Sequence, residues 1–215
     1  MDLFADLEAD APRTEALAPG AVLLRGHARA EAAALCDAVD AVTRRAPLRH
    51  MQTPGGFVMT VAMTNCGELG WVTDRSGYRY DRLDPESGAP WPPLPAAFRR
   101  VAQCAAAAAG FDGFEPDACL VNRYAPGAKL SLHRDADERD FSQPIVSVSL
   151  GIPATFLFGG LRRTDRTERI RLVDGDVVVW GGPARMRYHG VLALKDGSHP
   201  RLGACRINLT FRKAG

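Results

Sequence analysis

The sequence predicts an α+β protein with a mainly β core, folded as an antiparallel sandwich or jelly roll. Two helical patterns occupy the first half of the chain, and short strand-like segments follow one another after residue 115. Turn signals such as Pro126-Gly127 and Asp174-Gly175 separate these segments at even spacing. Short, evenly spaced strands of this kind are typical of antiparallel sheets that pack in two layers.

The first half of the chain is expected to contain a leader, a strand and two helices. Residues 1–19 hold five acids and one base and end at Pro19-Gly20, so we expect a flexible leader, followed by a strand at 21–25. Apolar residues at helical spacing predict a helix from Arg29 to Arg45, and a second one over about 95–109 that ends near Gly110. Between them, residues 48–93 are predicted to form loops and a hairpin, with a strand at 57–64; long irregular segments usually serve function.

The second half is expected to consist almost entirely of strands. These are predicted at residues 117–124, 129–133, 144–150, 154–158, 168–173, 176–180, 186–192 and 204–212. No repeat or composition change marks a domain boundary, so we expect one compact unit with a leader (1–19), an N-terminal extension (20–114) and a β core (115–215).

Composition excludes several classes of protein. The 215 residues are 46% hydrophobic and 24% charged, which are ordinary globular values, and no apolar run approaches the roughly 20 residues of a membrane span. The acidic start lacks the basic region of a signal peptide, so we expect a cytoplasmic protein. Five scattered cysteines suggest reduced, buried thiols. The net charge of +2 divides into −4 for residues 1–19 and +6 for the rest, a modest basic excess that is compatible with a nucleic-acid partner.

A candidate metal site lies in the segment Leu132-His133-Arg134-Asp135. Residues two apart on a strand point to the same face, so His133 and Asp135 can share one metal ion. A third ligand must come from elsewhere, and His189 lies on a later predicted strand. Two histidines and one carboxylate leave open positions on an octahedral ion, as iron(II) oxygenases require. An HxD pair alone is common by chance, so further features are needed.

The predicted last strand alternates strictly between polar and apolar residues. Arg206, Asn208, Thr210 and Arg212 share one face, which either is a solvated strand face or lines a cavity. In a cavity, arginine can bind a carboxylate through two hydrogen bonds. Asn122 and Tyr124 share a face in the same way and could bond to the same acid.

Taken together, these motifs resemble the AlkB family of 2-oxoglutarate- and iron(II)-dependent alkylation-repair dioxygenases, and its bacterial members in particular. The resemblance runs from about residue 17 to the C-terminus. It is carried by the segments TPGGF, VAMTNCG, LGW, DACLVNRYAPGAKLSLHRDADE, PIVSVSLG, FGGL, GDVVVWGG and RINLTFR. The combination of NRYAPGAKLSLHxDxDE with RxNLTFR is highly specific.

The resemblance implies a double-stranded β-helix core with N-terminal helices and a nucleotide-recognition lid. It implies iron on His133, Asp135 and His189, with O2 as oxidant, and 2-oxoglutarate held by Asn122, Tyr124, Arg206, Asn208 and Arg212. The expected reaction is oxidative demethylation of bases such as 1-methyladenine and 3-methylcytosine in DNA, with RNA left open, releasing formaldehyde and succinate. This is DNA repair by direct reversal of alkylation damage, and we expect a monomer.

By position, Trp71, Tyr78, Asp137 and Arg163 match the substrate contacts of the family. A base must be single-stranded or flipped out of a duplex to expose its Watson–Crick edge. Trp71 offers such a base a stacking face, and its other face is expected to lie against the His133 ring. Asp137 would favour a cationic methylated base by Coulomb attraction. Two of these residues also have an ordinary structural alternative: Trp71 as a core or loop-anchoring residue, and Asp137 as one acid in an exposed run.

Three other functions remain open from the residues alone. The chain could be a 2-oxoglutarate oxygenase that acts on RNA, protein or a small molecule. It could be a jelly-roll binding module, although such a module needs no open iron positions. It could also be a zinc hydrolase, which would not need Arg206 and Arg212 and could not support oxygen chemistry.

Overall fold

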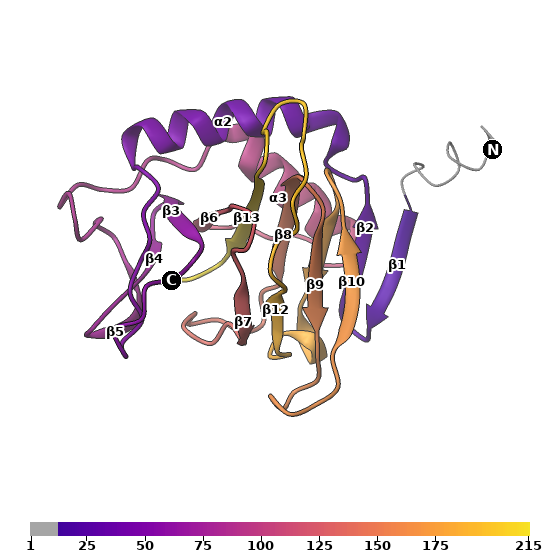
Figure 1. Cartoon of the computed structure of the whole chain (residues 1–215). Coiled ribbons are helices and arrows are strands. Elements are labelled where there is room, and N and C mark those ends of the chain that lie inside the picture. The colour runs from indigo at the N-terminus through magenta and orange to yellow at the C-terminus, as the bar shows by residue number, and fades with distance from the viewer. Residues whose placement is uncertain (1–12) are drawn as a thin grey trace.

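Two antiparallel sheets form the core of the computed structural model, which describes residues 13–215 (Figure 1). The seven-stranded sheet has the order β1 (Arg13–Ala18), β2 (Ala21–Arg25), β11 (Val177–Trp180), β8 (Ile145–Gly151), β13 (Arg206–Arg212), β6 (Ala118–Tyr124), β3 (Ala62–Gly67). The four-stranded sheet has the order β10 (Glu168–Leu172), β9 (Ala154–Phe158), β12 (His189–Val191), β7 (Leu130–His133). A separate hairpin pairs β4 (Gly70–Asp74) with β5 (Gly77–Asp81).

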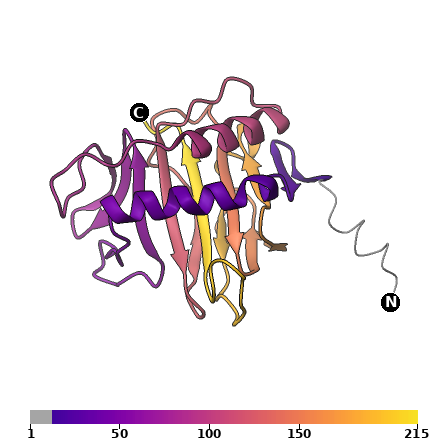
Figure 2. The ribbon, with the colours of Figure 1, turned by 90° about the horizontal axis from the view of Figure 1, so that it is seen from above.

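The two long helices cover one face of the seven-stranded sheet. Figure 2 shows α2 (Ala32–Arg45) and α3 (Ala96–Ala108) lying across the strands on this face. Leu35 and Val39 of α2 and Phe98 and Val101 of α3 are buried in one apolar cluster with Ile207, Leu209 and Phe211 of β13. Helix α3 ends before Gly110, whose φ of +84° suits glycine far better than other residues.

A second apolar cluster lies between the two sheets and occupies part of the space there. Phe156 and Phe158 of β9 lie against Trp180 of β11, with ring centroids 6.2 and 6.5 Å from that of the tryptophan. Burying aromatic side chains of this size contributes much of the apolar area that stabilises a two-layer fold. Phe156 and Trp180 of this cluster also contact the cavity that contains the candidate site residues.

Strand β13 lies inside the seven-stranded sheet, between β8 and β6, and all seven of its residues are buried. Its apolar face meets the helices, so its polar face must point into the space between the sheets. The structure therefore decides between the two sequence interpretations of this strand: the polar face lines a cavity and is not solvated.

The predicted β core and both helices are confirmed. Two details of the first half are wrong. Residues 13–18 are not part of a flexible leader, because they pair with β2 in register from Arg13↔Arg25 to Ala18↔Ala21; residues 1–12 lie outside the described part. The strand expected at 57–64 is displaced to β3 at 62–67, because its ladder with β6 begins at Ala62↔Arg123 and Gly55-Gly56 form a turn before it.

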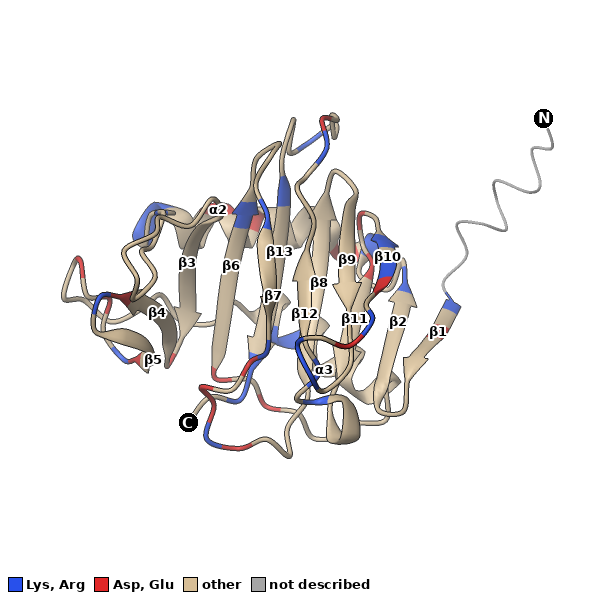
Figure 3. Ribbon diagram, turned by 60° about the horizontal axis from the view of Figure 1, so that its bottom comes forward, with Lys and Arg blue, Asp and Glu red and all other residues tan. Residues whose placement is uncertain are grey.

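Charged residues are concentrated in loops and at strand ends, while the middle of most strands carries none (Figure 3). Among residues 13–215, no helix has the length and apolar character needed to cross a membrane. All five cysteines are free thiols; four are buried, as expected, but Cys104 on α3 is exposed. The expectation of burial fails there because Cys104 lies on the solvent side of the helix.

Asp176 links the end of β2 to the turn that precedes β11. It is buried, and its Oδ1 accepts a hydrogen bond from the Gly26 amide at 2.9 Å. Its Oδ2 accepts from the Val173 amide at 3.0 Å and from Arg25 Nη1 at 2.8 Å.

We predict that Asp176→Ala lowers the free energy of unfolding by about 3 kcal/mol, because it leaves one buried amide, one half-buried amide and one cation without this acceptor. Urea denaturation monitored by circular dichroism would measure the loss. Asp196→Ala, at an exposed loop position, is the matched control and should change stability by less than about 0.5 kcal/mol. Equal losses in the two variants would contradict this account of Asp176.

Candidate functional site

One cavity of about 750 Å³ lies between the two sheets and opens beside the β4–β5 hairpin. It brings together all twelve residues that the sequence proposed as site residues. These come from β4, β5, β6, β7, β12, β13, the segment after β7 and the β9–β10 loop: Trp71, Tyr78, Asn122, Tyr124, His133, Asp135, Asp137, Arg163, His189, Arg206, Asn208 and Arg212.

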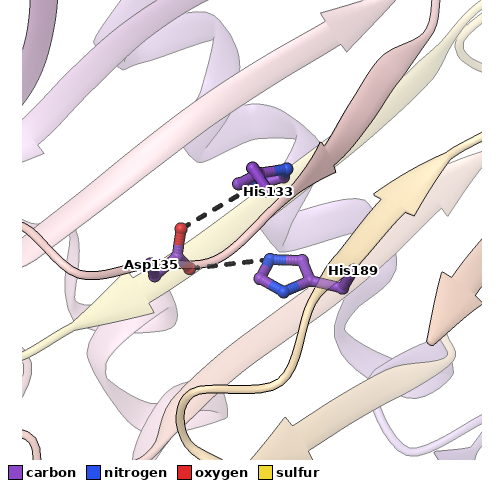
Figure 4. A group of neighbouring side chains, drawn as sticks. All are labelled: His133, Asp135 and His189. Carbon is purple, nitrogen blue, oxygen red and sulfur yellow. Dashed lines mark ion pairs between the residues drawn. The ribbon is translucent and has the colours of Figure 1, made fainter. Parts of the chain in front are cut away.

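His133, Asp135 and His189 form a group that could hold a metal ion. One ligand atom from each residue lies within 4.8 Å of the others. The Nε2 atom of His133 lies 3.7 Å from Oδ1 of Asp135, and the Nε2 atom of His189 lies 3.7 Å from Oδ2. The three side chains point toward one another (Figure 4). The histidines are brought together by the sheet, because His189 pairs directly with His133 across β12 and β7.

Backbone carbonyls orient both imidazole rings. His133 Nδ1 lies 2.9 Å from the carbonyl of Ser131, and His189 Nδ1 lies 3.1 Å from that of Arg187. A carbonyl can only accept, so in each ring Nδ1 is the donor, and in a neutral ring Nε2 is the atom left with a lone pair for a metal ion. Burial, and then the charge of His133, lower the pKa of His189 to about 4, which keeps this ring neutral and available as a ligand.

Glycine at position 190 permits the close approach of the two ligand strands. A Cβ on Gly190 would lie 2.8 Å from the carbonyl oxygen of Leu130 on β7. Side chains larger than hydrogen would therefore push β12 away from β7 beside His189.

Asp135 is held as a carboxylate by neighbouring cations. Arg212 donates to its Oδ2 through Nε at 3.1 Å and Nη2 at 2.8 Å. Burial alone would raise the pKa of Asp135, but Arg212 and the two histidines outweigh it and hold this pKa well below its usual range. An ionised carboxylate is the form that can bind a metal ion.

Arg206 offers unused hydrogen bonds deep in the cavity. The residue is 2% exposed, and its Nη2 donates to Ser149 Oγ at 2.9 Å. Its Nε and Nη1 are buried and have no partner among the described residues. Its guanidinium lies over the Tyr124 ring, 5.0 Å from the centroid. A buried cation with two unpaired N–H groups is costly, so this site is suited to a small molecule with a carboxylate.

Asn208 and Asn122 continue this polar surface. Asn208 Nδ2 donates to Ser147 Oγ at 2.8 Å and to the carbonyl of Val148 at 3.0 Å, so its position is fixed. Asn122 Nδ2 donates to Asn208 Oδ1 at 3.3 Å, while Asn122 Oδ1 is buried without a partner among the described residues. The two asparagines are direct neighbours across β6 and β13.

At the mouth of the cavity, Trp71 and Asp137 are joined directly. Trp71 Nε1 donates to Asp137 Oδ2 at 2.8 Å. The Trp71 ring stacks on Tyr78, with centroids 5.8 Å apart and planes inclined by 19°. Tyr78 is the diagonal neighbour of Trp71 on the hairpin and covers one face of the Trp71 ring. The expectation that the other face lies against His133 stays a prediction.

Several neighbours of the site were not identified from the sequence. Ser147 and Ser149 alternate within the apolar strand β8, and two hydroxyls on one face of a buried strand are a signal that could have been used. Glu138 and Arg185 are buried and Tyr80 is half-buried around Asp135, and the three residues come from separate segments of the chain. Only the folded chain brings them together.

Comparison with known proteins assigns this geometry to a family. Residues 20–212 match the profile of the 2OG-Fe(II) oxygenase superfamily. The chain belongs to this superfamily. Its members use Fe(II), 2-oxoglutarate and O2, and the carboxylate-histidine group and the unpaired N–H groups of Arg206 fit the metal and the co-substrate. The chain is therefore a 2-oxoglutarate-dependent dioxygenase.

Relatives place the chain within the AlkB family. The alpha-ketoglutarate-dependent dioxygenase AlkB of Salmonella typhimurium is 59% identical over 100% of this chain and 98% of its own length. The DNA N(6)-methyladenine demethylase ALKBH1C of Arabidopsis thaliana is 33% identical over 67% of this chain and 38% of its own length. The solved structure of OsALKBH1 has a TM-score of 0.78 and 28% identity, and the match covers 94% of this chain and 100% of that one. The double-stranded β-helix expected from the sequence is thus confirmed.

Proposed function

We propose that this dioxygenase removes N-linked methyl groups from nucleobases such as 1-methyladenine and 3-methylcytosine in DNA. RNA that carries the same lesions is the second candidate substrate. The observation that carries the proposal is the carboxylate of Asp137, fixed by Trp71 at the mouth of the cavity that contains His133, Asp135 and His189. An aromatic face and a fixed negative charge together suit a flat, cationic ring.

In this proposal, His133, Asp135 and His189 hold the iron, and Arg206 receives a carboxylate of 2-oxoglutarate on its unpaired Nε and Nη1. Asn122, Tyr124, Asn208 and Arg212 complete the polar wall around the co-substrate. With O2 as the oxidant, the bound iron and co-substrate would supply the oxidation of the N-methyl C–H bond: one oxygen atom enters succinate as 2-oxoglutarate loses carbon dioxide, and the other hydroxylates the methyl group, which leaves as formaldehyde.

The remaining residues select and position the base. Methylation at N1 of adenine or N3 of cytosine gives the ring a positive charge, which Asp137 attracts more strongly than it attracts an undamaged base. Trp71 and Tyr78 supply aromatic surface for the ring, and Arg163, exposed on the β9–β10 loop, can contact a backbone phosphate. A paired base cannot reach the buried metal site, so we propose that the target enters single-stranded or flipped out.

All twelve residues come from one chain, so the proposed site needs no second subunit, and we propose a monomer. A nucleic-acid substrate also supports the expected cytoplasmic location.

The decisive experiment measures succinate and formaldehyde released from an oligonucleotide that contains one 3-methylcytosine. We expect equimolar release by the wild type and no release by His133→Ala, which lacks one proposed ligand. DNA and RNA oligonucleotides of the same sequence would be compared. Succinate formation that does not depend on the methyl group would contradict base repair but leave the oxygenase intact.

Arg206→Lys is predicted to raise the KM for 2-oxoglutarate by roughly 10- to 100-fold, because a charge-assisted hydrogen bond contributes about 1.5–3 kcal/mol and lysine cannot reproduce the paired geometry. Steady-state succinate assays would measure it. Arg123→Lys, at an exposed position on the neighbouring strand β6, is the matched control. An unchanged KM in Arg206→Lys would exclude this residue as the carboxylate site.

Asp137→Asn removes the charge of this residue but keeps an oxygen that can accept from Trp71 Nε1. We predict that kcat/KM falls about ten-fold for cationic 3-methylcytosine, equivalent to about 1.4 kcal/mol, and much less for neutral 3-methylthymine. Competition between the two lesions in one reaction gives the ratio directly. Equal losses on both lesions would remove the electrostatic role of Asp137.

A further inference from the structure

Glu138 is a buried acid that the proposed reaction does not use. Its side chain is only 2% exposed, and its two oxygens bind two different arginines. Oε2 lies 2.9 Å from Arg185 Nη2, and Oε1 lies 3.2 Å from Arg212 Nε. Burying a charged group is costly unless it is paired, so these contacts define one connected network of charges.

The two arginines reach Asp135 from different sides. Arg212 donates to the carboxylate oxygen Oδ2, while Arg185 Nη1 donates to the backbone carbonyl of Asp135 at 2.9 Å. Arg185 also donates through Nε to the carbonyl of Gln143 at 3.1 Å, so its own position is fixed by the following loop. Both the side chain and the main chain of Asp135 are therefore held by cations that Glu138 neutralises.

The β4–β5 hairpin is attached to the same segment by two hydrogen bonds. Tyr80 Oη donates to Glu138 Oε1 at 2.7 Å, and Trp71 Nε1 donates to the adjacent Asp137. Tyr80 and Trp71 are direct cross-strand partners within the hairpin. The facing pair Trp71 and Tyr80 therefore holds the consecutive acids Asp137 and Glu138, which follow Asp135 by two and three residues.

We propose that Glu138 is a positioning residue that fixes Asp135 through Arg212 and Arg185, and that Tyr80 makes the hairpin part of this support. Groups that orient a metal ligand without touching the metal typically change metal affinity by 10- to 100-fold when they are removed. The inference rests on the proposed role of Asp135 as a metal ligand.

The test uses the full-length metal-free protein titrated with Co(II) in the presence of 2-oxoglutarate, followed by visible absorption. For Glu138→Gln we expect the Kd for Co(II) to rise about ten-fold and the absorption bands to shift, because the two arginines lose the charge that balances them. Tyr80→Phe, which removes a single hydroxyl, should shift the bands in the same direction and raise the Kd about three-fold. Glu168→Gln, an exposed acid on β10, is the matched control and should match the wild type.

Thermal melting of each variant separates positioning from stability alone. A lower Tm with an unchanged Kd and an unchanged spectrum in both variants would overturn the inference, because a purely structural role predicts that result. If Glu138→Gln does not fold, Tyr80→Phe decides on its own. Asp135→Ala is titrated alongside to separate the two proposals. If Asp135→Ala binds Co(II) as the wild type does, the proposed metal site is rejected as well. If Asp135→Ala loses Co(II) binding while Glu138→Gln and Tyr80→Phe behave as the wild type, only the positioning role is rejected.

Discussion

The burial of β13 on both faces is the constraint on which the rest of the molecule depends. A central strand in a sheet covered on both sides would ordinarily be apolar throughout, and this one carries two arginines, an asparagine and a threonine. Leaving such groups without partners in a low-dielectric interior is costly. The apolar residues Ile207, Leu209 and Phe211 anchor the strand against the helices, so the polar face must be satisfied in the space between the sheets. The cavity and its charged contents follow from that requirement.

Charge balance then organises the cavity into two ends. At one end, Arg212 is paired with Asp135 beside His189, whose lowered pKa keeps it neutral, and the charges are largely compensated within the chain. At the other end, Arg206 lies over Tyr124 and keeps two N–H groups unpaired. One end therefore suits a metal ion and the other a carboxylate, which is the division that a chelating 2-oxo acid requires. The hairpin adds a third region at the mouth, where aromatic surface and one carboxylate meet.

The sequence predicted much of this arrangement, and the limits of that prediction have a physical cause. Period-two alternation on β13 and β6 placed Arg206, Asn208, Asn122 and Tyr124 correctly, because alternation on a strand is a local property. The triad could be proposed from the resemblance, since His133 and Asp135 lie within its most specific motif and His189 lies on a later predicted strand. The environment of Trp71 could not be predicted, because it depends on the register of β4 against β5. Glu138 ends the HxDxDE motif, but its contacts with Arg185 and Tyr80 were missed for the same reason, since nothing local in the sequence marks residues that meet only through tertiary packing. The strand β1 was missed because its charged residues suggested solvent, whereas Glu15 pairs with Arg25 across the ladder.

The pairing of His189 with His133 has a consequence for how this architecture can vary. The distance between the two imidazoles is set by the ladder between β12 and β7, and the 55 residues between them have no direct part in it. Lengthening a surface loop costs little free energy, since the closure entropy grows only logarithmically with loop length. Insertions in the β9–β10 connection can therefore accumulate over evolution without moving the ligands. Remote members of the fold should therefore be recognised better by the strand register around the two histidines than by the number of residues between these histidines.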